Sequence, residues 1–152
     1  MTEQVDWLAG ASMMIRRDVF EAIGPLDDGY FMYFEEVDFC LRARRRGWTC
    51  WYINESRVAH FAGKSSGIDM AGAADKRLPP YWFRSRRRYW VKNHGFAYAL
   101  LVDSAAITCE VLRKARNFVQ RRPDNQPQRF LADLMRVGLS RGGPSTVSTQ
   151  GR

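Results

Sequence analysis

The apolar and polar residues between about Glu36 and Arg46 follow the period of an α-helix. Residues three and four positions apart form one face, which we expect to be buried with the aliphatic stem of an arginine along it. The residues of this predicted buried face are Val37, Cys40, Leu41 and Arg44. Asp38 and Arg42 lie four positions apart and are expected to form an ion pair on this helix, which Gly47 ends.

The sequence on either side of this helix predicts short strands and one further helix. Residues 7–15 form an apolar run that is typical of a buried strand. A short helix is expected over residues 16–23, ended by Gly24-Pro25. Residues 48–53 are rich in aromatic and β-branched side chains and predict the clearest strand of the chain, and residues 57–61 predict another.

The second half of the chain is predicted to be helical. A helix from Tyr81 is expected to have a basic side and an aromatic side and to end at Gly95. Its basic residues are Arg84, Arg87 and Arg88, and its aromatic residues are Trp82, Phe83, Tyr89 and Trp90. A long helix follows over residues 96–121, and residues 123–137 predict a linker and a short amphipathic helix. The tail from Arg141 is predicted to be disordered.

The composition is that of a globular, basic protein. Of the 152 residues, 45% are apolar and 13% aromatic, which is sufficient for one domain with a core. Lys and Arg number 24 against 16 Asp and Glu, and the net charge of +8 favours an anionic partner. Nucleic acid, a phospholipid surface and a phosphorylated substrate all satisfy this condition. The first residues lack the pattern of a signal peptide, and no apolar run reaches the roughly 20 residues of a membrane-spanning helix.

The cysteines do not suggest a cross-linked or metal-bound framework. Cys40, Cys50 and Cys109 are an odd number without close spacing, so neither a disulfide set nor a zinc site is predicted. Each has apolar neighbours, and we expect all three to be small core residues. This usage fits a reducing compartment.

Residues 30–42 place aromatic side chains directly against carboxylates. Tyr30, Phe31, Tyr33 and Phe34 precede the acids, which are Glu35, Glu36 and Asp38. Apolar surroundings remove water from a carboxylate and raise its pKa, which suits it to abstract a proton. A helix whose acidic first turn complements the helix dipole explains the same residues. The pattern by itself leaves both interpretations open.

An ordered series of residues from Trp7 to Gly67 supplies a context for these acids. The series consists of Gly10-Ala11, Ile15-Arg16-Arg17, Phe20, Ile23-Gly24, Leu26-Asp27, Tyr30-Phe31-Met32-Tyr33, Glu35-Glu36-Val37-Asp38, Leu41-Arg42, Gly47, His60 and Ser65-Ser66-Gly67. It resembles the C-terminal half of family 2 glycosyltransferases, particularly the bacterial rhamnosyltransferase-like members. Residues 81–95 resemble the aromatic and basic helix that follows in this family, more loosely.

The resemblance implies an α/β fold of the GT-A type, of which this chain would form a part. We expect a short mixed sheet with flanking helices and a helical C-terminal region. Residues 1–78 would form the acceptor-side, catalytic half of the transferase domain. Residues 79–122 would form a basic and aromatic helical extension, and residues 123–152 a linker, a short helix and a disordered tail.

The resemblance also implies a reaction, which is inverting transfer of a hexose or rhamnose from a nucleotide-diphospho-sugar to an acceptor hydroxyl. The acceptor would be a saccharide or a lipid-linked saccharide in polysaccharide or cell-envelope synthesis. Such chemistry needs a base at the acceptor and positive charge at the leaving diphosphate. Glu36 occupies the second acidic position of the family motif and is the candidate base. Glu35 and Asp38 are the candidate orienting partners.

Further site residues are implied in the same way. His60 matches a histidine that approaches the metal or the diphosphate in several relatives, and the metal would be Mg²⁺ or Mn²⁺. A lone histidine after a strand is equally explained by a structural role. The implied substrate-binding residues are Trp7, Gly10, Ala11, Tyr33, Arg42, Ser65 and Ser66.

The chain departs from the family because it contains no Asp-x-Asp metal motif, and six residues precede Trp7. We therefore expect a truncated or split transferase, whose activity would require a protein partner that carries the nucleotide-binding half. The expected location is the cytoplasm, at the inner face of the plasma membrane. A catalytically inactive remnant that serves as an interaction module is the alternative.

The arginines of residues 84–88 have three interpretations. Together with the neighbouring aromatic rings they could bind a lipid-diphosphate acceptor at a membrane surface. They could bind nucleic acid through phosphate contacts and stacking, which is favoured by charge alone. They could also be a solvated face whose aromatic side is packed. The helix from Phe96 fits membrane docking and core packing equally, and Asp103 and Glu110 argue against a span.

Overall fold

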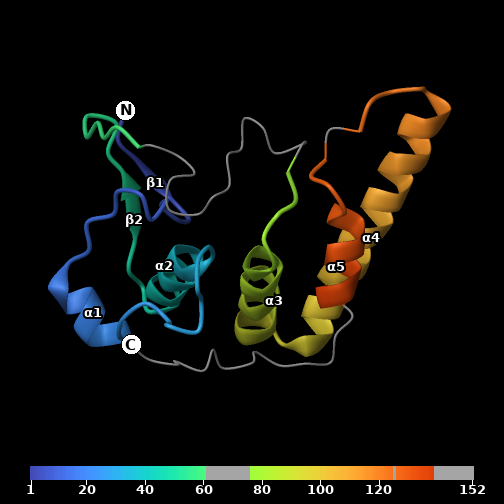
Figure 1. Ribbon diagram of the computed structural model, residues 1–152. Helices are drawn as coiled ribbons and strands as arrows, with labels where there is room; N and C mark the ends of the chain where they lie inside the picture. The colour runs from blue at the N-terminus through green and yellow to red at the C-terminus, as the bar shows by residue number, and fades with distance from the viewer. Residues whose placement is uncertain (61–75, 125, 139–152) are drawn as a thin grey trace, which may run out of the picture. The chain divides into compact units, whose positions relative to one another are not determined.

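The computed structural model describes residues 1–60, 76–124 and 126–138 of the chain. Within these residues the fold is mixed α/β, with one two-stranded sheet and five helices (Figure 1). The chain forms two compact units, Met1–Phe61 and Ala62–Arg152. The predicted tail from Arg141 and the predicted residues Ser65 and Ser66 lie outside the described residues.

The first unit combines a small antiparallel sheet with two helices. Strand β1 (Glu3–Val5) pairs with β2 (Cys50–Tyr52), and Val5 lies opposite Cys50. Helix α1 spans Arg17–Ile23 and helix α2 spans Glu35–Arg45. The core contains buried Val19, Phe39 and Ala43, with Ile15, Phe20, Ile23 and Trp48 packed against it.

The sequence located both helices of this unit correctly. Gly24 ends α1 at a φ of 77°, a left-handed backbone angle that glycine adopts without a steric penalty. Helix α2 ends within one residue of its predicted end. Its buried face was predicted only in part, because Cys40 is buried as expected but Val37 and Leu41 are only half buried, and Phe39 and Ala43 are buried instead. Arg44 is exposed and forms an ion pair with Asp6 instead of lying along the core.

The strand predictions were correct only for β2. Residues 7–15 do not form a strand, and β1 lies ahead of them at Glu3–Val5. Met14 is exposed and Trp7 is half exposed, so the apolar run is not a buried segment. Residues 57–60 are likewise without regular structure.

The second unit is helical. Helix α3 (Pro80–His94) and helix α4 (Phe96–Val119) meet at Gly95, and α5 (Phe130–Gly138) packs against both. These elements confirm the predicted helices. The Phe83 ring is buried, with its centroid 5.6 Å from that of Phe130. Among the described residues, no helix has the length and apolar character needed to cross a bilayer.

The expected basic side of α3 is only partly exposed to solvent. Arg87 is buried, and it shares the carboxylate of the fully buried Asp103 with the half-buried Arg86. The prediction that Arg87 belongs to a basic surface was therefore wrong. Cys109 was also misassigned, since its side chain is exposed while Cys40 is buried.

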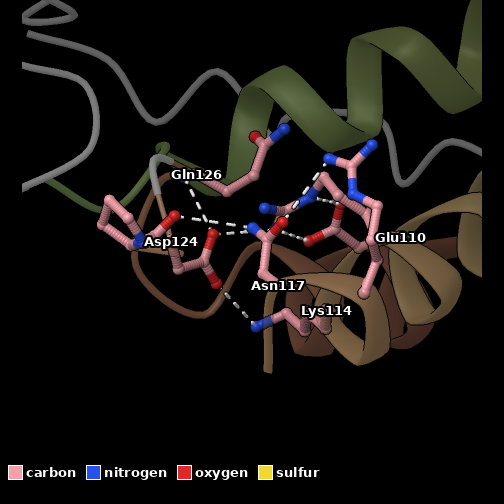
Figure 2. Close-up of polar contacts among 8 residues, drawn as sticks. Glu110, Lys114, Asn117, Asp124 and Gln126 are labelled. Atoms are coloured by element: carbon pink, nitrogen blue, oxygen red, sulfur yellow. Dashed lines mark hydrogen bonds and ion pairs between the residues drawn. The ribbon is translucent and has the colours of Figure 1, made fainter. Parts of the chain in front are cut away.

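The C-terminal end of α4 is tied to the segment that follows it. Arg113 donates two hydrogen bonds to Glu110, at 2.8 and 2.6 Å, and forms an ion pair with Asp124 at 2.8 Å. Figure 2 shows Lys114 directed at the same Asp124 carboxylate, 3.3 Å away. Asp124 also accepts a hydrogen bond from the backbone N–H of Gln126. These contacts hold the residues after α4 against its polar side.

Candidate active site

The acidic stretch lies at the N-terminus of α2, directly after a sharp backbone reversal. Tyr33 and Phe34 have φ angles of 68° and 71°, in the left-handed region that non-glycine residues rarely occupy. Two such residues in succession imply local strain, which structures usually retain at functional positions. The reversal brings the Tyr30 hydroxyl to 3.4 Å from a carboxylate oxygen of Asp38.

Asp38 is part of a structural clamp. Its carboxylate has no exposed surface and accepts a hydrogen bond from Nε of Arg42 at 2.9 Å, as the i, i+4 spacing predicted. The other guanidinium nitrogens donate to the backbone carbonyls of Ile23 and Pro25, each at 2.7 Å. The pair therefore fastens α2 to the end of α1. Both residues were predicted site residues, and the structure gives each a set of internal partners.

Glu36 differs from Asp38 in its burial and in its hydrogen bonds, and both properties decide how well a carboxylate accepts a proton. It is half buried, and burial is the main cause that raises the pKa of its carboxyl, with a smaller contribution from the negative charge of Glu35. The Oε2 atoms of Glu36 and Glu35 are both buried, and neither has a hydrogen-bond partner among the described residues. A carboxylate in this state retains an unused acceptor position. Within the acidic corner, which consists of Glu35, Glu36 and Asp38 at the start of α2, Glu36 is the group best suited to accept a proton.

Gly10 covers the stem of Glu36. A Cβ atom placed on Gly10 would lie 3.8 Å from Cβ and 4.0 Å from Cγ of Glu36. The predicted substrate-binding residue and the candidate base are therefore neighbours, although they come from a loop and a helix that are distant in sequence. Ala11 follows in the same loop and is exposed, and Tyr33 is half buried.

Cys40 lies one helical turn below Glu36, beside Cys50 of β2. Burial is the main cause that raises the pKa of the Cys40 thiol to about 11, and the charge of Glu36 is among the lesser causes. The backbone N–H of Leu8 acts in the opposite direction. A thiol with this pKa stays protonated near neutral pH, so Cys40 is a packing residue and not a nucleophile.

A hollow lies beside the strands of the first unit, next to Trp7. Its lining residues are Gln4, Val5, Asp6, Trp7, Arg44, Gly47, Trp48, Thr49 and Cys50. The ion pair between Asp6 and Arg44 links the two sides of this hollow. The sequence identified Trp7 but did not identify Asp6 or Trp48 as its neighbours. No spacing signal connects them, because β1 and the end of α2 meet only in the folded unit.

His60 is exposed at the end of the described part of the first unit. Among the described residues, no group of three or more His, Cys, Asp or Glu side chains could together hold a metal ion. Those residues therefore do not fit a protein-bound metal centre. The metal role of His60 stays a prediction, and no chemical step below depends on it.

Known proteins similar to this chain are sugar transferases. The chain is 39% identical over 88 residues to N-acetylglucosaminyl-diphospho-decaprenol L-rhamnosyltransferase of Mycobacterium tuberculosis, across 57% of this chain and 29% of that protein. It is 40% identical over 58 residues to rhamnosyltransferase WbbL of Escherichia coli, across 38% of this chain and 22% of that protein. It is 56% identical over 41 residues to the low-salt glycan biosynthesis hexosyltransferase Agl10 of Haloferax volcanii, across 27% of this chain and 13% of that protein.

The chain thus spans less than a third of the length of these curated relatives. No family model matches it, and no solved structure matches it. Part of the chain is therefore similar in sequence to rhamnosyl- and hexosyltransferases.

Proposed function

We propose that this chain contains the acceptor-side, catalytic part of an inverting family 2 glycosyltransferase of the GT-A type, with Glu36 as its general base. The observation that carries the proposal is the state of Glu36, which is half buried with a raised pKa and an Oε2 atom that has no partner among the described residues. The similarity to rhamnosyl- and hexosyltransferases supports the reaction class.

In the proposed reaction, the Glu36 carboxylate accepts the proton of an acceptor hydroxyl as its oxygen attacks the anomeric carbon of the donor sugar. The new glycosidic C–O bond forms while the bond to the diphosphate breaks, and the nucleoside diphosphate leaves with the electron pair. A carboxyl group with a raised pKa is a stronger base than an ordinary glutamate, which favours this transfer. Asp38 acts as a positioning residue, since both of its oxygens are engaged inside the unit.

The proposed substrates follow from the chemistry and the relatives together. The donor is a nucleotide-diphospho-rhamnose or a related nucleotide-diphospho-hexose, and the acceptor is a saccharide, either free or linked to a polyprenyl diphosphate. The nucleotide-binding half of the site would come from a segment or a partner other than the residues described here. A Mg²⁺ or Mn²⁺ ion would neutralise the charge of the diphosphate. It would be held mainly by that other segment or partner, and His60 is the residue of this chain proposed to approach it. The reaction would take place at the cytoplasmic face of the membrane.

A chimera tests this function. The matched segment of Escherichia coli rhamnosyltransferase WbbL is replaced by that of this chain, and transfer of labelled rhamnose to acceptor is measured. We expect the chimera to be active and Glu36→Gln to lower the transfer rate by at least about a hundred-fold, which is the range of general-base contributions. Glu21→Gln, at an exposed position in the last turn of α1, is the matched control and should retain the rate.

Two outcomes would contradict the proposal. Unchanged transfer in Glu36→Gln would remove Glu36 from the chemistry. An inactive chimera that folds and binds donor would favour a catalytically silent segment that serves as an interaction module. Circular dichroism and donor titration of each chimera separate these outcomes from simple misfolding.

A further inference from the structure

The outward face of α4 is apolar over its whole length. Leu101, Leu112 and Val119 are 69%, 64% and 79% exposed, and Phe118 is 87% exposed. Val111 and Tyr98 lie on the same side and are about half exposed. The positions between them are small or uncharged, and they are Ala97, Ser104, Ala105, Thr108 and Ala115. A solvated helix would carry charged residues at most of these positions.

The acidic residues of α4 are all on its opposite side. Asp103 and Glu110 are buried, and arginines neutralise both of them, from α3 in one case and from Arg113 in the other. The outward face therefore contains no carboxylate. At 100° per residue, the exposed apolar residues cover roughly 160° of the helix circumference. That width exceeds the narrow seam of a two-stranded coiled coil, and the positions flanking such a seam would be charged, whereas here they include Val111 and Phe118.

Positive charge surrounds the C-terminal end of this face. Arg116 is exposed on α4, and exposed Arg121 and Arg122 follow directly. The backbone N–H of Arg122 donates to the carbonyl of Asn117 at 2.9 Å, which keeps both arginines at the end of the helix. The contacts of Asp124 with Arg113 and Lys114 hold the following segment to the polar side (Figure 2).

The charge of the second unit points to a negatively charged surface. Residues 76–138 contain fourteen Lys and Arg against four Asp and Glu. Each of the four acids is already paired with Arg or Lys within the unit. The described part of the unit therefore has a large excess of positive charge. Residues 1–60, by contrast, contain seven basic and ten acidic residues.

We propose that the outward face of α4, defined by Leu101, Val111, Leu112, Phe118 and Val119 with Arg116, Arg121 and Arg122 at its end, docks on an anionic lipid bilayer. The helix lies in the plane of the interface, its apolar side chains enter the boundary between headgroups and acyl chains, and the arginines bind lipid phosphates. This surface is independent of the Glu36 corner, and docking requires no catalysis.

Vesicle co-sedimentation of the full chain tests the docking surface. The vesicles are phosphatidylcholine with about one third phosphatidylglycerol, compared with phosphatidylcholine alone. We expect binding to the anionic vesicles that weakens with added salt. Leu112→Gln combined with Val119→Gln should reduce it by about ten-fold or more, because two exposed aliphatic groups no longer enter the bilayer. Glutamine is a good helix former, and retention of the far-ultraviolet circular dichroism spectrum confirms the fold.

Matched variants separate the two parts of the surface. Arg121→Gln with Arg122→Gln should weaken binding to anionic vesicles by about ten-fold or more. Met14→Gln, which removes a fully exposed apolar side chain from the first unit, and Arg46→Gln with Arg57→Gln should leave binding unchanged. Equal binding of the wild type and the Leu112/Val119 variant would overturn the proposal. So would a wild-type dimer that this variant converts to a monomer while vesicle binding is absent.

Discussion

Nε of Arg42 donates to a carboxylate oxygen of Asp38 at 2.9 Å, in a pair whose acidic member has no exposed surface. The remaining nitrogens of Arg42 hold the carbonyls of Ile23 and Pro25. The acid nearest to this pair in sequence, Glu36, has no such partner among the described residues for its Oε2 atom. Two acids of one helical turn are therefore expected to respond differently to substitution.

Asp38→Ala should destabilise the first unit strongly. Removing one member of a buried ion pair leaves the other charge without compensation, which costs about 3–5 kcal/mol. Asp38→Asn keeps an acceptor for Arg42 and should cost less. Urea unfolding followed by tryptophan fluorescence measures both. If Asp38→Ala unfolds at the wild-type urea concentration, the clamp does not hold α2 to α1.

Glu36→Gln should stabilise the folded chain at neutral pH. The folded state raises the pKa of Glu36 above its ordinary value of 4.5, so between these two values the unfolded chain ionises first. Ionisation then opposes folding, and stability declines as the pH rises from about 4.5 through the folded pKa. Glutamine removes this cost, and we expect a midpoint about 2 °C higher at pH 7.

The increase in the unfolding midpoint should disappear below the ordinary pKa of a glutamate, where Glu36 is protonated in both the folded and the unfolded chain. Thermal unfolding between pH 3.5 and pH 8 on the chain and on Glu36→Gln measures this difference, with Glu21→Gln as the exposed control. A gain that persists unchanged in acid would mean that charge is not its cause. Lower stability at neutral pH would mean that the Glu36 carboxylate has a stabilising partner.

Gly138→Ala should destabilise the helical unit. A Cβ on Gly138 would lie 3.1 Å from the Cβ, Cγ and Oδ2 atoms of Asp103. Arg86 and Arg87 hold both oxygens of that carboxylate, so it cannot move aside. We expect a loss of about 1–3 kcal/mol, which is typical of overpacking. Ala132→Gly, at an exposed position of α5, is the control for helix propensity and should cost about 1 kcal/mol. Unchanged or increased stability of Gly138→Ala would mean that the Asp103 side chain moves aside at no cost.

Periodicity in the sequence predicted the helices well because their ends carry local signals. Gly24 and Gly95 end α1 and α3 through positive φ angles that their neighbours could adopt only with strain. The choice of Glu36 as candidate base comes from the resemblance of residues 35–38 to a known motif, and it stays a prediction. Both inferences depend on residues that are close together in the sequence.

Other features depend on contacts that are distant in the sequence, and these were missed or misassigned. The apolar run of residues 7–15 resembles a strand, yet pairing with β2 selects Glu3–Val5, because strand formation depends on the partner more than on composition. Arg87 was predicted to be exposed, since a charged residue is rarely buried without a partner. Its partner Asp103 lies on another helix, and no sequence period reveals it.

The left-handed backbone at Tyr33 and Phe34 makes the acidic corner a largely local structure. Among the described residues, Tyr30 and Arg42 contact Asp38, and Arg42 also holds Ile23 and Pro25, which all lie within twenty consecutive residues. Loops of this size close at a low entropic cost. These contacts can therefore form early in folding. A hybrid sugar transferase built with residues 23–42 would also need the loop of Gly10, which covers Glu36.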